Sequence, residues 1–225
     1  MAKVFDLPRM RDKIRVFRDR NDAGKVLAGM MESYRRSNSI VLAIPAGGVP
    51  VASVIAGKLN LVLDLAVTSK IILPWNSEVG YGAVTFDGTV KLNEELISNL
   101  KLTPQTVEEG IKNTQEKVQR RIDNLRGDLP IPAISKHTVI LVDDGLASGF
   151  TMKTAVEAVR KLEAERIVVA VPTAHYESMQ SLIQKVNEVY CPNIRKGWRY
   201  AVADAYKYWS DIEEKELEMM LDKVM

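Results

Sequence analysis

Residues 139–151 read Val-Ile-Leu-Val-Asp-Asp-Gly-Leu-Ala-Ser-Gly-Phe-Thr, and they give the clearest indication of the fold class. The four apolar residues at the start are typical of a strand that helices cover on both faces of a parallel sheet. Two adjacent carboxylates, Asp143 and Asp144, follow, and a loop of small residues then leads into a helix at about Thr151. Because open parallel sheets bind ligands at the carboxyl ends of their strands, the two carboxylates mark a candidate site.

Short apolar runs alternate with amphipathic helical stretches along the rest of the chain. In addition to 139–142, the runs predict strands at 40–44, 61–68, 71–73 and 166–171. The spacing of apolar residues predicts helices at 21–31, 49–58, 104–126, 151–163, 177–189 and 212–224. Strands that alternate with helices indicate an α/β fold, with a mostly parallel sheet flanked by helices and joined by right-handed crossovers.

The segment 74–130 follows a different pattern. Residues 74–82 have the composition of a long loop, and Asp87-Gly88 suits the turn of a short hairpin over 83–92. Thr103-Pro104 is a strong helix start, and the helix that follows is charged with a narrow apolar stripe. We therefore expect a helical insertion on the edge of a single domain that spans 1–225.

Composition and charge exclude several classes of protein. The chain has 225 residues, of which 46% are hydrophobic and 27% charged, and its formal net charge is +2, so bulk charge gives no support to a nucleic-acid partner. Its apolar runs are far shorter than the about 20 residues of a membrane span, and no signal peptide is evident at the N-terminus. The single cysteine, Cys191, excludes an intramolecular disulfide and a cysteine-rich zinc site, which fits a cytoplasmic location.

The stretch 143–151 also indicates a chemistry. Backbone N–H groups at a helix start, with Gly149 in the loop and the hydroxyls of Ser148 and Thr151 nearby, form a cradle that favours phosphate. Carboxylates suit a polyol or a hydrated magnesium ion. Taken singly, such features are more often plain helix caps, but together they predict a site for a phosphorylated sugar. A Walker A loop is excluded, because no Gly-Lys-Ser/Thr follows the glycines.

This stretch resembles the phosphoribosyl-diphosphate motif of the type I phosphoribosyltransferases. Further segments recur in the same order in a little-characterised branch of that family, so the resemblance covers most of the chain: Phe17–Arg20 with Ala23-Gly24, Pro45–Ala52, Lys70-Ile71, Gly82–Val84 and Cys191. The resemblance implies a type I phosphoribosyltransferase core with a C-terminal hood. It also implies transfer of phosphoribose from phosphoribosyl diphosphate to a nucleobase or other nitrogen acceptor, with Mg²⁺ as cofactor and release of pyrophosphate.

The resemblance also implies roles for individual residues. Asp143 and Asp144 would hold the ribose hydroxyls, directly or through magnesium-bound water. The 5-phosphate would lie in the loop formed by Ala147, Ser148, Gly149, Phe150 and Thr151. The pyrophosphate would meet a loop formed by Ala46, Gly47 and Gly48, where relatives often carry a strained or cis peptide, and Lys70 would add charge. Residues 74–100 would form a mobile flap within the insertion of 74–130, and 172–225 a hood over the acceptor.

Three departures from the family pattern leave the activity open. Ala46 and Ser69 stand where this branch commonly has Arg, so two charges that would face pyrophosphate are absent; Arg18, Arg20 or Lys70 could compensate. Ala147 stands where purine-salvage relatives of the hypoxanthine type carry the Asp that acts on the base, and Glu78 is a candidate replacement. The alternatives are therefore a non-catalytic regulator that binds phosphoribosyl diphosphate or a nucleotide and, with less support, a phosphosugar hydrolase.

Other residues carry weaker expectations. Tyr206, Tyr208 and Trp209 could stack on a planar acceptor or simply pack the last helix. His137 and His175 are isolated and do not predict a metal site, and Cys191 is expected to be a buried small hydrophobe. Met219–Leu221 belong to the core or to a dimer surface, and the narrow face of the 104–126 helix could serve a homodimer.

Overall fold

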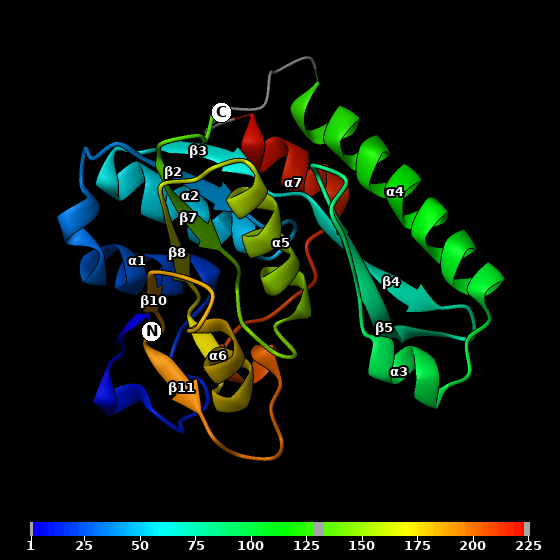
Figure 1. Cartoon of the computed structure of the whole chain (residues 1–225). Helices are drawn as coiled ribbons and strands as arrows, with labels where there is room; N and C mark the ends of the chain where they lie inside the picture. Colours follow the sequence, from blue (N-terminus) through cyan, green and yellow to red (C-terminus); the bar gives the residue numbers. More distant parts are fainter. Residues whose placement is uncertain (1, 128–132, 223–225) are drawn as a thin grey trace.

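The centre of the molecule is a sheet of six strands in which all neighbouring strands run parallel (Figure 1). The computed structural model describes residues 2–127 and 133–222. Within these residues the order of the strands across the sheet is β1(Lys3–Phe5), β10(Glu188–Tyr190), β8(Arg166–Ala170), β7(Thr138–Val142), β2(Ser39–Ala43) and β3(Val62–Leu65). The predicted α/β class is confirmed. Connections from β2 and from β7 lead in opposite directions across the sheet, so the switch point of the topology lies between these two strands.

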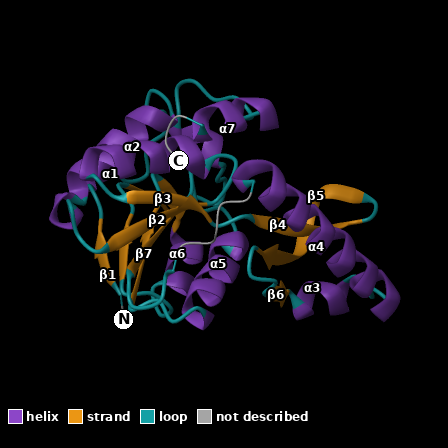
Figure 2. Cartoon of the chain, turned by 90° about the horizontal axis from the view of Figure 1, so that it is seen from above, coloured by secondary structure: helices purple, strands orange, loops and turns teal. Residues whose placement is uncertain are grey.

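Helices cover both faces of this sheet. α1(Arg20–Met30) and α2(Gly48–Leu59) lie on one face, and α5(Phe150–Lys161) and α6(Tyr176–Leu182) lie on the other (Figure 2). Alternate residues of β7 face the two layers: Ile140 and Val142 pack with α1 and α2, whereas Val139 and Leu141 pack with α5 and α6. Burial on both faces is the reason why β7 is apolar at four consecutive positions.

The insertion forms a second, antiparallel sheet beside the first. β4(Thr68–Leu73), β5(Asn76–Thr85) and β6(Val90–Leu92) pair in this order, α3(Glu94–Asn99) follows, and α4(Pro104–Arg126) packs on β4 and β5 (Figure 1). The predicted hairpin over 83–92 and the helix start are confirmed, since the Thr106 amide donates to the Thr103 hydroxyl at 3.2 Å.

Two expectations for this region are wrong. Residues 76–82 belong to β5 instead of a long loop, and the single strand expected at 61–68 divides between β3 and β4, which lie in different sheets. The cause of the first error is tertiary. Tyr81 is fully buried under α4, close enough that a Cβ on Gly110 would lie 1.9 Å from its hydroxyl, and a composition rich in glycine does not reveal that contact.

The C-terminal part contains more strands than its apolar spacing predicts. The expected helix over 177–189 ends as α6 at Leu182, and residues 188–190 form β10. Val189 and Tyr190 are buried because β10 fills the gap between β8 and β1. Two short strands, β9(Thr173–His175) and β11(Asn193–Arg195), pair in parallel, and the expected last helix is α7(Glu214–Leu221). The end of that expected helix, at 223–224, lies outside the described residues.

Candidate active site

The loops that follow β2 and β7 meet at the switch point of the sheet. The loop after β2 contains a cis peptide bond between Pro45 and Ala46, as the resemblance implies. A Cβ on Gly47 would lie 1.9 Å from Asp144 Oδ2, and a Cβ on Gly48 would lie 2.6 Å from the Val142 carbonyl oxygen. Only glycine therefore allows the predicted pyrophosphate loop to lie directly against the carboxylate pair.

A cavity of about 190 Å³ lies at the end of β7. It is lined by Asp143, Asp144 and the whole predicted 5-phosphate loop, 147–151, together with Lys70 of β4 and Val202 of the C-terminal region. Gly149 precedes α5 with a φ of +70°, and the Phe150 amide donates to Ser148 Oγ at 3.3 Å. The residues singled out around β7 in the sequence therefore lie around one opening, at the first turn of a helix.

Burial controls the electrostatics of the two carboxylates. Both residues are half-buried, and the Asp144 amide donates to Asp143 Oδ1 at 2.9 Å. The pKa of Asp143 lies well above its usual range, first because of burial and then because of the neighbouring charge of Asp144. Burial also raises the pKa of Asp144, and the positive charge of Arg20 opposes that rise. A cation beside the pair would stabilise the ionised form of both carboxylates and so lower both pKa values.

The donor set fits Mg²⁺ held jointly with a substrate. Among the described residues, no group of three or more His, Cys, Asp or Glu side chains is placed to hold a metal by itself. Mg²⁺ characteristically keeps water and binds one or two carboxylates together with substrate phosphates. Asp143 and Asp144 supply the two carboxylates beside a cavity of about 190 Å³, so they are the residues that would hold the ion.

Arg20 is the cation that contacts the carboxylate pair. Its Nε lies 2.9 Å from Asp144 Oδ2, and a terminal nitrogen donates to the Ser210 carbonyl oxygen at 2.8 Å. Its guanidinium lies over the Trp209 ring, 3.8 Å from the ring centre. Of the cations considered from the sequence, Arg20 and Lys70 are at the site, whereas Arg18 is bound to Asp19 with its side chain 60% exposed.

Positions 46 and 69, where relatives commonly carry arginine, have neutral side chains that lie against or within the core. Ser69 is buried within β4, and Ala46 is half-buried against the apolar core. Ala147 is exposed at the cavity, and its carbonyl oxygen accepts a hydrogen bond from the Ser178 hydroxyl. The side chain of Glu78, the candidate replacement for the missing acid, lies outside the described residues.

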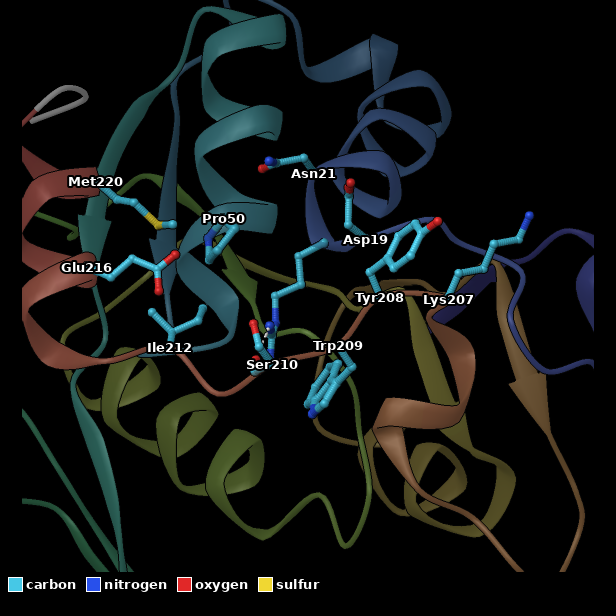
Figure 3. Close-up of a pocket in the computed structure, with 11 residues that line it drawn as sticks. Asp19, Asn21, Pro50, Lys207, Tyr208, Trp209, Ser210, Ile212, Glu216 and Met220 are labelled. Atoms are coloured by element: carbon cyan, nitrogen blue, oxygen red, sulfur yellow. Dashed lines mark hydrogen bonds between the residues drawn. The ribbon is translucent and has the colours of Figure 1, made fainter.

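The aromatic residues of the C-terminal region surround Arg20. Tyr206 is buried, donates from its hydroxyl to the Asp144 carbonyl oxygen at 2.6 Å, and packs beside Phe17. Trp209 lies 5.1 Å from the Tyr206 ring and, with Tyr208, borders a second pocket of about 490 Å³ between α1, α2 and the 207–216 segment (Figure 3). The contacts of Tyr206 and Val202 with the site are not evident from the sequence, because only the folding of the C-terminal region creates them.

The remaining candidates lie elsewhere. Cys191 is fully buried, and burial raises the pKa of its thiol, as expected for a small core residue. His137 is a hydrogen-bonding partner of the Ser135 carbonyl oxygen, and His175 lies beside Tyr200. Leu221 is buried, whereas Met219 is 57% exposed. In the described part of the chain, no helix combines the length and the apolar character that a membrane span needs.

This fold and site define a class of protein. The family model for the phosphoribosyl transferase domain matches residues 19–205, so the chain belongs to the phosphoribosyl transferase family. It is similar to two Mycobacterium tuberculosis proteins that carry phosphoribosyl transferase as a provisional name, with 29% identity over 210 residues and 93% of this chain covered. The chain spans about half the length of these curated relatives, 47% of each.

A solved structure shares the fold. The crystal structure of the TT1426 protein from Thermus thermophilus has 30% sequence identity with this chain and superimposes with a TM-score of 0.76. The alignment covers 94% of this chain and 99% of that one. The mostly parallel sheet flanked by helices is therefore shared along nearly the whole length of both proteins.

Proposed function

We propose that this protein transfers phosphoribose from phosphoribosyl diphosphate to a nitrogen acceptor and releases pyrophosphate. One observation supports the proposal above all: the carboxylate pair, the loop 147–151 and Lys70 line a single cavity, and Gly47 lies directly against Asp144. This proximity supports a single site for the phosphorylated donor. A nucleobase or another nitrogen nucleophile is the acceptor class that the family favours.

Each part of the site has a role in this proposal. The N–H groups at the start of α5 and the hydroxyls of Ser148 and Thr151 bind the 5-phosphate. Asp143 and Asp144 bind the ribose hydroxyls and, together with the substrate, Mg²⁺, which when bound neutralises the departing pyrophosphate. The Ala46–Gly48 loop lies where the pyrophosphate leaves, and Lys70 and Arg20 supply the positive charge that Ala46 and Ser69 lack.

The surroundings would exclude water during the reaction. Attack on the anomeric carbon passes through an oxocarbenium-like transition state, which water would also capture. We assign the flap to 74–100, within the insertion of 74–130, and the hood to 172–225, all within one domain of 1–225. Closure of the flap would then complete the site.

Loss of one carboxylate charge tests the proposal. Asp144→Asn should abolish magnesium-dependent binding of phosphoribosyl diphosphate, measured by calorimetry. The circular dichroism spectrum and a cooperative melting transition should show that the variant is still folded. Asp123→Asn on α4, an exposed position outside the site, is the matched control and should bind normally. Unchanged binding by Asp144→Asn would contradict the proposal.

A regulator that binds phosphoribosyl diphosphate without turning it over is the second candidate. The contact that favours it is the ion pair of Arg20 with Asp144, because it occupies a carboxylate that the reaction needs. Pyrophosphate release in the presence of a panel of nucleobases and amines separates the two candidates. Robust release with any acceptor excludes a pure sensor, whereas tight binding without release excludes the transferase.

Location and assembly complete the proposal. We propose a cytoplasmic protein, since its single cysteine is a buried thiol. Dimerisation through α4 stays a prediction, and its measurement is the mass in solution. The apolar residues Val107 and Ile111 of that helix border a groove of about 570 Å³ beside α3, where a second copy could pack.

A further inference from the structure

Four lysines from three parts of the chain converge around Glu157 on α5. Lys153 and Lys161 lie one helical turn before and after Glu157, so all three share one face of the helix. Lys91 of β6 forms an ion pair with Glu157 Oε1, and Lys185, from the segment after α6, approaches the same oxygen at 3.4 Å. We call Lys91, Lys153, Lys161 and Lys185 the lysine cluster.

Acidic side chains do not balance this cluster. Among the described residues, Glu157 is the carboxylate that the cluster contacts directly. Asp87 contributes only through Thr89, whose hydroxyl donates to Asp87 at 2.7 Å and accepts from Lys161 at 3.1 Å. With four ammonium groups around two carboxylates, the surface carries excess positive charge.

A neighbouring arginine adds to this excess. The guanidinium of Arg160 donates to the Lys185 carbonyl oxygen, so its charge also lies beside the cluster. The molecule as a whole carries a formal charge of only +2, so this surface concentrates charge that the rest of the chain disperses. An anion is the ligand that such a surface attracts.

Partial burial makes the excess charge unfavourable in the free protein. The side chains of Lys91 and Glu157 are each 27% exposed, and that of Lys185 is 36% exposed. The pKa of Lys153 is lowered, first by burial and then by the positive charges of Lys185 and Lys91. A bound anion would offset this repulsion between the lysines. Water would screen the same repulsion if the side chains were fully solvated.

The shape of the cluster suits a short anion. From Lys153 to Lys161 the helix rises about 12 Å, so the charges cover about two turns. One end borders the loop 147–151, since a Cβ on Gly149 would lie 3.6 Å from Lys153 Cε. The other end borders the turn between β5 and β6, which contains Thr89. A nucleic acid would need a longer basic track.

We infer that the lysine cluster binds an oligophosphate anion at a site separate from the carboxylate cavity. The phosphate chain could come from inorganic polyphosphate or from a nucleoside triphosphate, because both present the same run of charged oxygens. Lys91 belongs to the antiparallel sheet, whereas Lys153, Lys161 and Lys185 belong to the layer of helices on the six-stranded sheet. A bound anion would therefore hold the second sheet against α5.

Calorimetry with inorganic tripolyphosphate, without magnesium, tests the inference. The double variant Lys91→Gln/Lys185→Gln should bind at least tenfold more weakly than the wild type. Lys25→Gln/Lys58→Gln, with two exposed lysines of α1 and α2, removes the same charge elsewhere and should bind within twofold of the wild type. Lys91→Arg/Lys185→Arg should retain binding. Adenosine triphosphate in place of tripolyphosphate distinguishes the two sources, and cluster-dependent binding of either ligand supports the inference.

Other outcomes would overturn it. These are absence of binding of both tripolyphosphate and adenosine triphosphate to the wild type, equal loss in the cluster and control variants, or cluster-dependent binding of a single-stranded oligonucleotide alone. Thr151→Val tests the loop at the start of α5: if it abolishes binding and the lysine double variant does not, the anion lies in that loop. Asp144→Asn should leave tripolyphosphate binding unchanged, so a failure of the proposed transferase function is recognised separately.

Discussion

Arg20 and Asp144 are 124 positions apart in the chain, yet Arg20 Nε donates to Asp144 Oδ2 at 2.9 Å. Their side chains are 12% and 15% exposed, so solvent and salt screen this ion pair less than a surface pair. The same guanidinium reaches the Ser210 carbonyl oxygen and the Trp209 ring. One arginine therefore joins the start of α1, the carboxylate loop and the 207–216 segment.

Removal of the Arg20 charge should shift the pH dependence of ligand binding. Burial raises the pKa of Asp144 and Arg20 opposes the rise, so Arg20→Gln should raise this pKa further. In the proposed function, magnesium-dependent binding needs the ionised carboxylate and is lost as pH falls through that pKa. In the variant the loss should begin at a higher pH, which calorimetric titrations of phosphoribosyl diphosphate from mildly acidic to neutral pH would measure.

Arg18→Gln is the control for this shift. Arg18 lies two positions away and binds Asp19 instead of the carboxylate pair. Its loss changes the net charge by the same amount and should leave the pH dependence of binding unchanged. An equal shift in both variants would mean that long-range charge, and not the contact with Asp144, sets the profile.

Asp143→Asn should stabilise the ligand-free protein at neutral pH. The folded-state pKa of Asp143 lies above its unfolded value of about 3.9, so ionisation on the way to neutral pH weakens the fold. The amide cannot ionise, and the free energy of unfolding should rise by on the order of 1 kcal/mol. Urea denaturation measures the gain, which should disappear in acid, below the unfolded-state pKa. A gain that persists there would assign the effect to packing.

Gly47→Ala should abolish binding of phosphoribosyl diphosphate. The added Cβ would lie 1.9 Å from Asp144 Oδ2, so the Ala46–Gly48 loop or the carboxylate must move. Gly57→Ala on α2 is the matched control: its Cβ would meet nothing within 4 Å, and alanine should stabilise the helix by about 0.5–1 kcal/mol. Binding and melting temperature measure both effects, and normal binding by Gly47→Ala would show that the close approach is unimportant.

Arg126→Met should destabilise the attachment of α4. Arg126 and Asp64 form an ion pair between the end of α4 and β3, with side chains 4% and 8% exposed. The variant leaves a buried carboxylate without this partner, which typically costs about 3–5 kcal/mol. Urea denaturation measures the loss, and Asp64→Asn in the same chain should restore part of it. A loss below about 1 kcal/mol would show that the pair contributes little.

The parts of the fold that were predicted correctly depend on local pattern. The strand over 139–142, its apolar continuity and the helix that follows are recognisable because neighbouring residues carry the signal. The start of α4 at Thr103-Pro104 is equally local, since it consists of one hydroxyl cap and one proline. The errors occurred where local pattern and tertiary contact disagree. Val189 fits a helical spacing, but it lies in β10, because backbone pairing with both β8 and β1 holds this segment extended.

The candidate site divides in the same way. The two carboxylates and the loop 147–151 are contiguous in sequence, so the amino-acid string alone determined their identity and their order at the end of a strand. Only the tertiary structure decided that Gly47 lies against Asp144, that Arg20 and not Arg18 reaches this carboxylate, and that Lys91 and Lys185 approach Glu157. The physical reason is the separation of the interacting residues along the chain. The apolar pattern of a strand and the capping of a helix involve residues a few positions apart, whereas these contacts join distant segments that meet only when the sheet and its helices pack.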